Sequence, residues 1–148
     1  TRPVEETVTL LTDEQVRPIR ENIDFGIRFF GASGIESGTD WTLEDLDEAF
    51  ARWQRASDRL GYSDEFIIEV LGAMFGEYCA VQLNMRWIKL KDQGGTTLAV
   101  EGIEREFRAF PYQAIVKRIE DSEHGFFHNV FVFIKHQSQE ARSRASMA

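Results

Sequence analysis

The chain has 148 residues, the size of one ordinary domain, and can bury about two-thirds of its unfolded surface in a single core. Hydrophobic residues make up 43% and charged residues 28%, which is close to globular averages and excludes wholesale disorder and a fibrous repeat. The 25 acidic and 17 basic residues give a formal net charge of −8, so the chain repels a phosphate backbone and nucleic acid is not an expected partner.

The first helix is predicted from Thr12. The segment 12–15 has capping-box spacing, with a hydroxyl at its first position and an amide three residues later. Apolar residues then recur at three- and four-residue steps, at Val16, Ile19, Ile23, Ile27 and Phe30. Pro18 leaves two alternatives open, a kink at this residue or a helix that begins only near Arg17, because proline lacks the N–H that a helix interior uses. The glycine- and serine-rich residues 31–39 then end the helix.

Two further helices follow. Thr42 can cap the second helix, and Gly61 lies where a left-handed C-terminal cap is expected. The third helix, over residues 64–83, is apolar on more than one side, which predicts a central position. Gly72 and Gly76 each cost about 1 kcal/mol against alanine in a helix interior, so we expect a seam there at which another backbone approaches closely.

Around Trp87 the helical period changes to strict alternation, which predicts a strand. Residues 92–95 have turn chemistry, and residues 96–100 are a second β-prone run, so the sequence predicts a hairpin over 86–100. A third strand is possible over 103–110. An isolated hairpin is marginal in water, so we expect the sheet to lie on the helices with Trp87 as a core anchor.

Pro111 suits the first position of a fourth helix. Residues 126–136 fit either a helix or a buried strand, and we favour a helix. Residues 138–148 are polar and small, which predicts a frayed or disordered tail. The predicted fold is therefore α+β, with N-terminal helices packed on a small antiparallel sheet and two C-terminal helices, in a single domain over residues 1–137.

No recognisable catalytic motif occurs, so we assign no catalytic residue and no cofactor, and an enzyme is the less favoured class. His124 and His128 are weak metal candidates, because zinc sites normally show three or four ligands; we assign no metal. Cys79 is the only cysteine and lies on an apolar helix, which favours a packed thiol over a nucleophile. No apolar segment is long enough to span a membrane, no signal peptide is seen in the sequence as given, and we expect a cytoplasmic protein. A leader removed ahead of residue 1 stays open.

Glu77 lies on the apolar third helix and needs a partner if it is buried. It can reach solvent or pair with Arg86; alternatively, Glu77, Tyr78 and Trp87 can line a ligand pocket where helix 64–83 meets the hairpin. That second arrangement defines the rival functional class, a small-ligand binder or enzyme.

The phenylalanines outnumber what the core is expected to bury, and a surplus exposed patch is typical of a partner site. The residues at issue are Phe29, Phe30, Phe107, Phe110, Phe126 and Phe127. The favoured function is therefore a non-catalytic protein-interaction module that acts through an apolar patch ringed by acidic residues. An immunity-type inhibitor or a secretion chaperone fits that description; the partner and the oligomeric state stay open.

Residues from about Leu71 to Ile134 resemble a bacterial family of domains of unknown function, numbered 3806. The features that carry the resemblance are the glycines and Glu77 of the third helix, the Trp87-Ile88 strand, the turn over 92–95, and Pro111 leading into residues 116–119. The resemblance implies a small bacterial α+β domain with no established activity and no catalytic residue to transfer.

Overall fold

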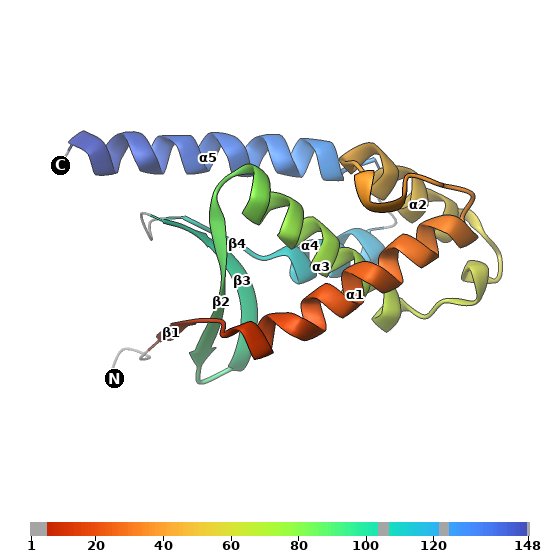
Figure 1. Ribbon diagram of the computed structural model, residues 1–148, viewed down its shortest axis with the longest axis horizontal. Coiled ribbons are helices and arrows are strands. Elements are labelled where there is room, and N and C mark those ends of the chain that lie inside the picture. The colour runs from red at the N-terminus through yellow and green to blue at the C-terminus, as the bar shows by residue number, and fades with distance from the viewer. Residues whose placement is uncertain (1–5, 104–106, 122–124, 148) are drawn as a thin grey trace.

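The computed structural model of the protein describes residues 6–103, 107–121 and 125–147. Within these residues the chain forms an α+β fold of five α-helices and a four-stranded sheet, which confirms the predicted class. The elements in chain order are β1 (Thr7–Leu10), α1 (Asp13–Ala32), η1 (Gly38–Asp40), α2 (Leu43–Arg55), η2 (Arg59–Gly61), α3 (Asp64–Gln82), β2 (Met85–Asp92), β3 (Gly95–Gly102), β4 (Arg108–Ala109), α4 (Pro111–Glu120) and α5 (Phe127–Met147). Figure 1 shows the sheet at one end of the molecule and the long α5 along one side.

The sheet is antiparallel throughout, with strand order β1-β2-β3-β4. The predicted hairpin is present as β2 and β3, and Trp87 pairs with Val100. Of the possible third strand over 103–110, only the two residues of β4 are strand, Ile103 is in a turn, and residues 104–106 lie outside the described part of the chain. The sequence analysis did not predict β1, which pairs with β2.

The N-termini of α1, α2 and α3 follow the local signals, whereas α2 ends at Arg55, well before the cap predicted at Gly61. Thr12 Oγ1 accepts a hydrogen bond from the Gln15 N–H, and Gln15 Oε1 accepts one from the Thr12 N–H at 2.9 Å, which completes the predicted capping box. α1 begins at Asp13 and continues through Pro18, so the alternative start near Arg17 is wrong. Pro18 is exposed in the second turn and has no N–H to donate to the Glu14 carbonyl, which lies at an exposed position where water can donate to it.

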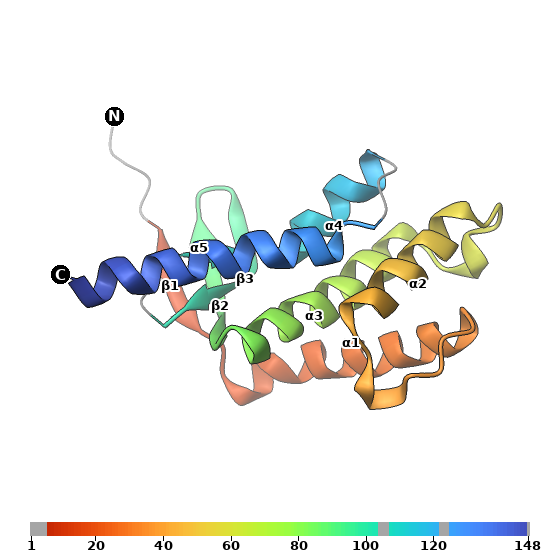
Figure 2. The ribbon, with the colours of Figure 1, turned by 90° about the horizontal axis from the view of Figure 1, so that it is seen from above.

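α3 is the central helix and packs against α1 and α4, as its all-round apolar pattern predicts. Both of its predicted seam glycines are in close contact, but with rings rather than with a second backbone. A Cβ at Gly72 would overlap the Tyr112 ring, and one at Gly76 would overlap the Trp87 ring. Figure 2 shows α1 and α3 side by side as they lead away from the sheet.

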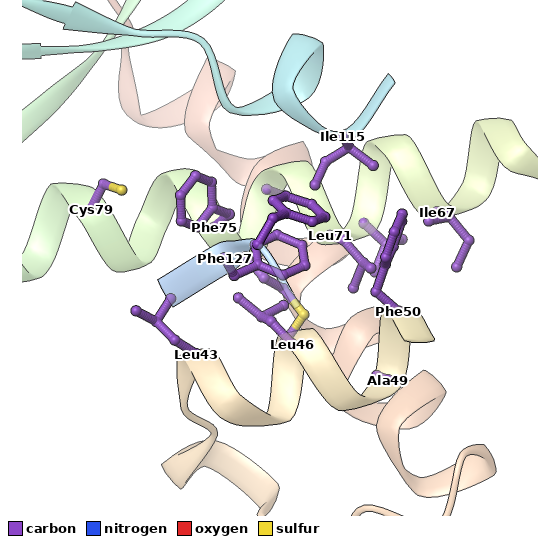
Figure 3. Close-up of a cluster of buried hydrophobic side chains, with 14 of the residues drawn as sticks. Leu43, Leu46, Ala49, Phe50, Ile67, Leu71, Phe75, Cys79, Ile115 and Phe127 are labelled. Atoms are coloured by element: carbon purple, nitrogen blue, oxygen red, sulfur yellow. The ribbon is translucent and has the colours of Figure 1, made fainter. Parts of the chain in front are cut away.

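The core surrounds α3 and includes residues of all five helices and of the sheet, and one part of it lies where α2, α3, α4 and the start of α5 meet. Figure 3 shows Leu46 and Phe50 of α2, Leu71 and Phe75 of α3, and Phe127 of α5 converging there. The largest fully buried side chain is that of Trp53, whose indole N–H donates to the Tyr62 carbonyl at 3.0 Å. Trp87, the predicted anchor of the sheet, is 7% exposed and belongs to the same core.

α5 differs most from what the sequence predicts. Residues 127–136 are helical, as favoured, but the helix does not end there. Residues 138–147, expected as a frayed tail, continue α5 to Met147. Ser138 and Ala141 are buried, and Arg142 Nη2 donates to the Leu83 carbonyl at 2.6 Å, so tertiary contacts order a segment whose composition alone suggests disorder.

The start of α5 is held by a residue of another helix. Asp47 of α2 accepts a hydrogen bond from the Phe127 N–H at 2.8 Å and a longer one from the His128 N–H at 3.4 Å. The first backbone N–H groups of a helix have no partner within the helix, and Asp47 accepts from two of them. Because Asp47 is far from α5 in the sequence, local capping rules do not identify it. None of the described helices is long and apolar enough to cross a bilayer.

Candidate functional site

Glu77 and Trp87 lie together where α3 meets β2, as the sequence analysis expected. They line a hollow of about 460 Å³ with residues of β1, α1 and the start of β2. The Trp87 ring is buried, and within the described residues its indole nitrogen has no hydrogen-bond partner. The sequence suggests Arg86 as a partner for Glu77. In the structure Arg86 lies near Glu101 instead, with 3.9 Å between Arg86 Nη2 and Glu101 Oε1. We call this the Glu77 hollow.

Tyr78 does not share the Glu77 hollow. Its ring packs against Trp41, at a centroid distance of 5.9 Å, and against Phe131 of α5, at 5.2 Å. Consecutive residues of a helix point about 100° apart, so Tyr78 faces α5 while Glu77 faces β1 and α1. The structure therefore joins two of the three predicted site residues and separates the third.

The other chemical candidates give no catalytic or metal site in the described residues. His128 is the second residue of α5, and His124 lies outside the described part of the chain. No group of three potential metal ligands occurs among the residues that the structure describes. Cys79 is 1% exposed, and burial raises the pKa of its thiol to about 12, so the thiolate needed for nucleophilic chemistry is not populated near neutral pH.

The six phenylalanines that the sequence singles out differ in burial. Phe29, Phe30, Phe126 and Phe127 are core residues, whereas Phe110 is 39% exposed and Phe107 is half-buried. The sequence analysis missed Phe133 of α5, which at 59% is more exposed than Phe110.

Phe110 and Phe133 line a second concavity, of about 670 Å³. We call it the α4–α5 groove. Its apolar lining consists of Phe75, Phe107, Ala109, Phe110, Pro111, Ala114, Phe126, Val130, Phe133 and Ile134. Its polar lining consists of Arg108, Gln113, Lys117, Arg118 and Asn129. This volume is within the usual range for binding pockets, which is about 300–1,000 Å³.

The polar lining carries one sign of charge. Among the described residues that line the groove there are three cations and no carboxylate, although the chain as a whole carries −8. Lys117 is exposed, and the Arg118 guanidinium lies over the Phe126 ring, 5.3 Å from its centroid. Arg108 forms ion pairs with Glu101 and Glu6. Arg108 is therefore neutralised by carboxylates and Arg118 is engaged by an aromatic ring, so Lys117 is the exposed cation of an aromatic-lined groove.

Glu101, which anchors Arg108, is the second residue that sequence reasoning missed. Its side chain is 3% exposed, and its Oε2 accepts a hydrogen bond from Arg108 Nε at 2.9 Å. Arg108 and Glu101 are register partners on β4 and β3, and Arg86 is the register partner of Glu101 on β2. The buried carboxylate thus lies between two arginines, the arrangement that a buried charge requires.

Comparison with known families shows which family the chain belongs to. A family described as a domain of unknown function (DUF3806) matches residues 47–131, from α2 into the first turns of α5. The match covers more than half of the chain, and the protein belongs to this family. No curated protein and no solved structure matches the chain significantly. The family segment includes the Glu77 hollow's α3 and β2 residues and most of the α4–α5 groove, but assigns neither a role.

Proposed function

We propose that the protein is a non-catalytic protein-interaction module that binds its partner through the α4–α5 groove. The observation that carries this proposal is the pair of exposed aromatic rings, Phe110 and Phe133, on a groove of about 670 Å³. Exposed apolar surface of this kind costs solubility unless a partner covers it, and aromatic residues are enriched at the centres of protein interfaces.

The charge around the groove differs from the predicted one. The sequence analysis expected an apolar patch ringed by acidic residues, whereas the described polar lining is basic. A secretion chaperone or an immunity-type inhibitor both bind a protein target, and an open groove supports the chaperone-like role because it can hold a segment of a partner chain. We place this activity in the cytoplasm, in keeping with a single, buried cysteine that forms no intrachain disulfide.

The test compares Phe133→Ser with Val132→Ser. Val132 is 49% exposed and precedes Phe133 on α5, but it does not line the groove, so the two variants remove similar apolar surface from neighbouring positions. Each purified variant is immobilised and challenged with lysate of the cells that produce the protein. We expect Phe133→Ser to lose a captured protein that the native chain and Val132→Ser both retain. Equal capture by both variants would exclude the groove as the docking site.

A second candidate is a small-ligand site in the Glu77 hollow. The observation that favours it is the buried Trp87 indole N–H, which has no hydrogen-bond partner within the described residues, in a residue that lines the same hollow as Glu77. Buried polar groups are satisfied in the great majority of native structures, so a ligand or a water molecule is expected to satisfy this donor.

Ligand-observed NMR on a small-molecule library tests the second candidate. We expect hits that bind the native protein to be lost in Glu77→Gln and kept in Glu14→Gln, which changes the same charge at an exposed position of α1. A library that yields no hit sensitive to Glu77→Gln would contradict the small-ligand function.

A further inference from the structure

We infer that two copies of the chain pair through the free edge of β1, as antiparallel strands that join their two sheets into one. This interface shares no residue with the described lining of the α4–α5 groove, so it adds a second surface to the proposed function. Three features support it: the unprotected edge of β1, the direction of its backbone groups, and the match of the strand with a second copy of itself.

β1 is an unprotected edge of the sheet. It lies on the outer side of β2 (Figure 1), and all four of its residues are exposed. Edge strands offer unpaired backbone groups to other strands, and proteins commonly protect them with charges, with proline or by making them very short. β4, at the opposite edge, has only two residues, one of which is the ion-paired Arg108. The segment Thr7–Leu10 contains neither a charge nor a proline, so β1 lacks these protections.

The hydrogen-bond pattern shows which backbone groups of β1 point outward. The Leu11 N–H donates to the Trp87 carbonyl at 3.3 Å. In an antiparallel ladder, pairs that exchange hydrogen bonds alternate with pairs whose backbone groups point away from each other. The N–H and C=O groups of Val8 and Leu10 therefore point away from β2, and no backbone group of the described residues outside the sheet bonds to them. A row of such groups is satisfied by another strand.

A second copy of β1 matches these outward groups in one register. When Val8 of each copy lies opposite Leu10 of the other, a two-fold axis passes beside Thr9, and every outward group of both strands is paired. A shift of two residues in one direction puts Leu10 opposite Glu6. A shift in the other direction puts Val8 opposite Thr12, the N-cap of α1. Either shift takes part of the pairing outside the strand.

The same register matches the side chains on one face of the sheet. Val8 and Leu10 share this face with their register partners on β2, Leu90 and Ile88. Val8 is 37% exposed and Leu10 is 54% exposed, whereas both β2 residues are buried. Each row across the joined sheets then contains Ile88 and Leu10 of one copy, followed by Val8 and Leu90 of the other. The exposed side chains are covered by the second copy, in rows that are aliphatic throughout.

The opposite face brings no like charges close together in this row. Thr9 lies opposite Thr9 of the other copy, a cross-strand pair that stabilises sheets, and its register partner on β2 is Lys89. The Lys89 residues of the two copies are separated by three strand spacings, about 14 Å. This separation exceeds the screening length of about 8 Å at physiological ionic strength, so their repulsion is weak.

Cysteine cross-linking tests the register. Residues opposite each other in a non-hydrogen-bonded antiparallel pair have Cα atoms about 4.5 Å apart, which is within the range of a disulfide. We expect Thr9→Cys to form a disulfide-linked dimer in oxidised glutathione. Thr7→Cys is the matched control on the same face, because Thr7 lies opposite Leu11 and about 13 Å along the strand from its own copy, and it should stay monomeric. The native Cys79 is 1% exposed and does not compete.

Sedimentation equilibrium measures the dimer without a cross-link. We expect a dimer fraction that rises with protein concentration up to about 1 mM, a range that includes weak association. Val8→Lys places a charge on the edge strand and should abolish the dimer. Val132→Lys makes the same change at an exposed valine of α5 and should leave the dimer unchanged, as should Phe133→Ser in the groove.

Several results would overturn the inference. These are a monomer over the whole concentration range, equal cross-linking of Thr9→Cys and Thr7→Cys, or a dimer that survives Val8→Lys. A dimer that needs Phe133 would also overturn it, as would a benzophenone amino acid at Leu10 that crosslinks in cells to a different protein and not to a second copy. If no dimer forms while lysate capture still depends on Phe133, the paired strands fail and the proposed function stands.

Discussion

Gly76 shows how a single residue fixes the junction of helix and sheet. It is buried in α3, and the position of its missing side chain is filled by the Trp87 ring and by Pro111. The ring can approach the helix this closely only because no Cβ stands between them. The entropic cost of glycine in a helix interior is therefore offset by the packing of the residue that anchors the sheet.

Gly76→Ala is expected to destabilise the protein, because the new methyl group would overlap the Trp87 ring, which is held by Pro111 and by the sheet. Overpacking of this kind costs about 1–3 kcal/mol. Gly31→Ala on α1 is the matched control, because a Cβ there meets no other atom within 4 Å, and it should be neutral or stabilising. Urea unfolding checks both. A Gly76→Ala protein as stable as Gly31→Ala would contradict the close contact.

The residue scale also shows what the sequence could and could not predict. Trp87 and Glu77 were placed together correctly, because a helix and the strand that follows it pack locally. Glu101 was missed because its two arginine partners are fixed by strand register, which involves β4 as well as β2. Phe133 was missed because the alternation 130–134 suits a helix or a strand, and only the helix puts Phe131 against Tyr78 and Phe133 in the groove.

Among the elements, α5 depends on α2 for its start. Asp47 accepts hydrogen bonds from the N–H groups of Phe127 and His128, so the joint of the two helices is a cap supplied from a distance in the sequence. Burial raises the pKa of the Asp47 carboxyl above its ordinary value of 3.8, and the hydrogen bonds from α5 oppose that rise. The hydrogen bonds from α5 therefore stabilise the ionised form of a partly desolvated carboxyl group.

Asp47→Ala should destabilise the protein by about 1–2 kcal/mol, the range for loss of a helix cap. Asp47→Asn keeps an acceptor oxygen and should lose less. Asp24→Ala, at an exposed position of α1, is the control and should be near neutral. Urea unfolding at neutral pH measures all three, and an Asp47→Ala protein as stable as Asp24→Ala would show that the cap contributes nothing.

The raised pKa of Asp47 also predicts a pH dependence with a definite sign. The folded state binds the Asp47 proton more tightly than the unfolded chain, so this group adds stability below the unfolded value of 3.8 and loses that contribution as pH rises through the raised folded value. The native protein should therefore gain stability relative to Asp47→Asn as pH falls from neutral towards 4, as measured by unfolding at both pH values. A difference that is constant with pH would contradict the raised pKa.

The sequence predicted the helices better than the strands and the chain ends. α1, α2 and α3 have local caps at Thr12, Thr42 and Ser63, and each cap is present in the structure. β1 has only four residues and finds its partner about 80 residues later, so no local pattern could indicate it. The second half of α5 has a polar composition, and its order depends on Ser138, Ala141 and Arg142 contacting the rest of the fold.

The whole molecule combines an acidic chain with an aromatic-lined groove. A net charge of −8 disfavours non-specific association, and the charged residues of the described groove lining are cations, of which Arg108 is paired with Glu101 and Glu6. The family match covers most of this groove, from β4 and α4 to the first turns of α5, so the same surface can be examined in other members of the family.

Site-specific photo-crosslinking in the cells that produce the protein provides the most direct test of the α4–α5 groove as a protein-docking site. A benzophenone amino acid is introduced at Phe133 in one variant and at Val132 in another, two exposed neighbours of which only Phe133 lines the groove. We predict a discrete crosslinked protein from position 133 that is absent or much weaker from position 132. The same products from both positions, or none from position 133, would contradict the proposed docking site.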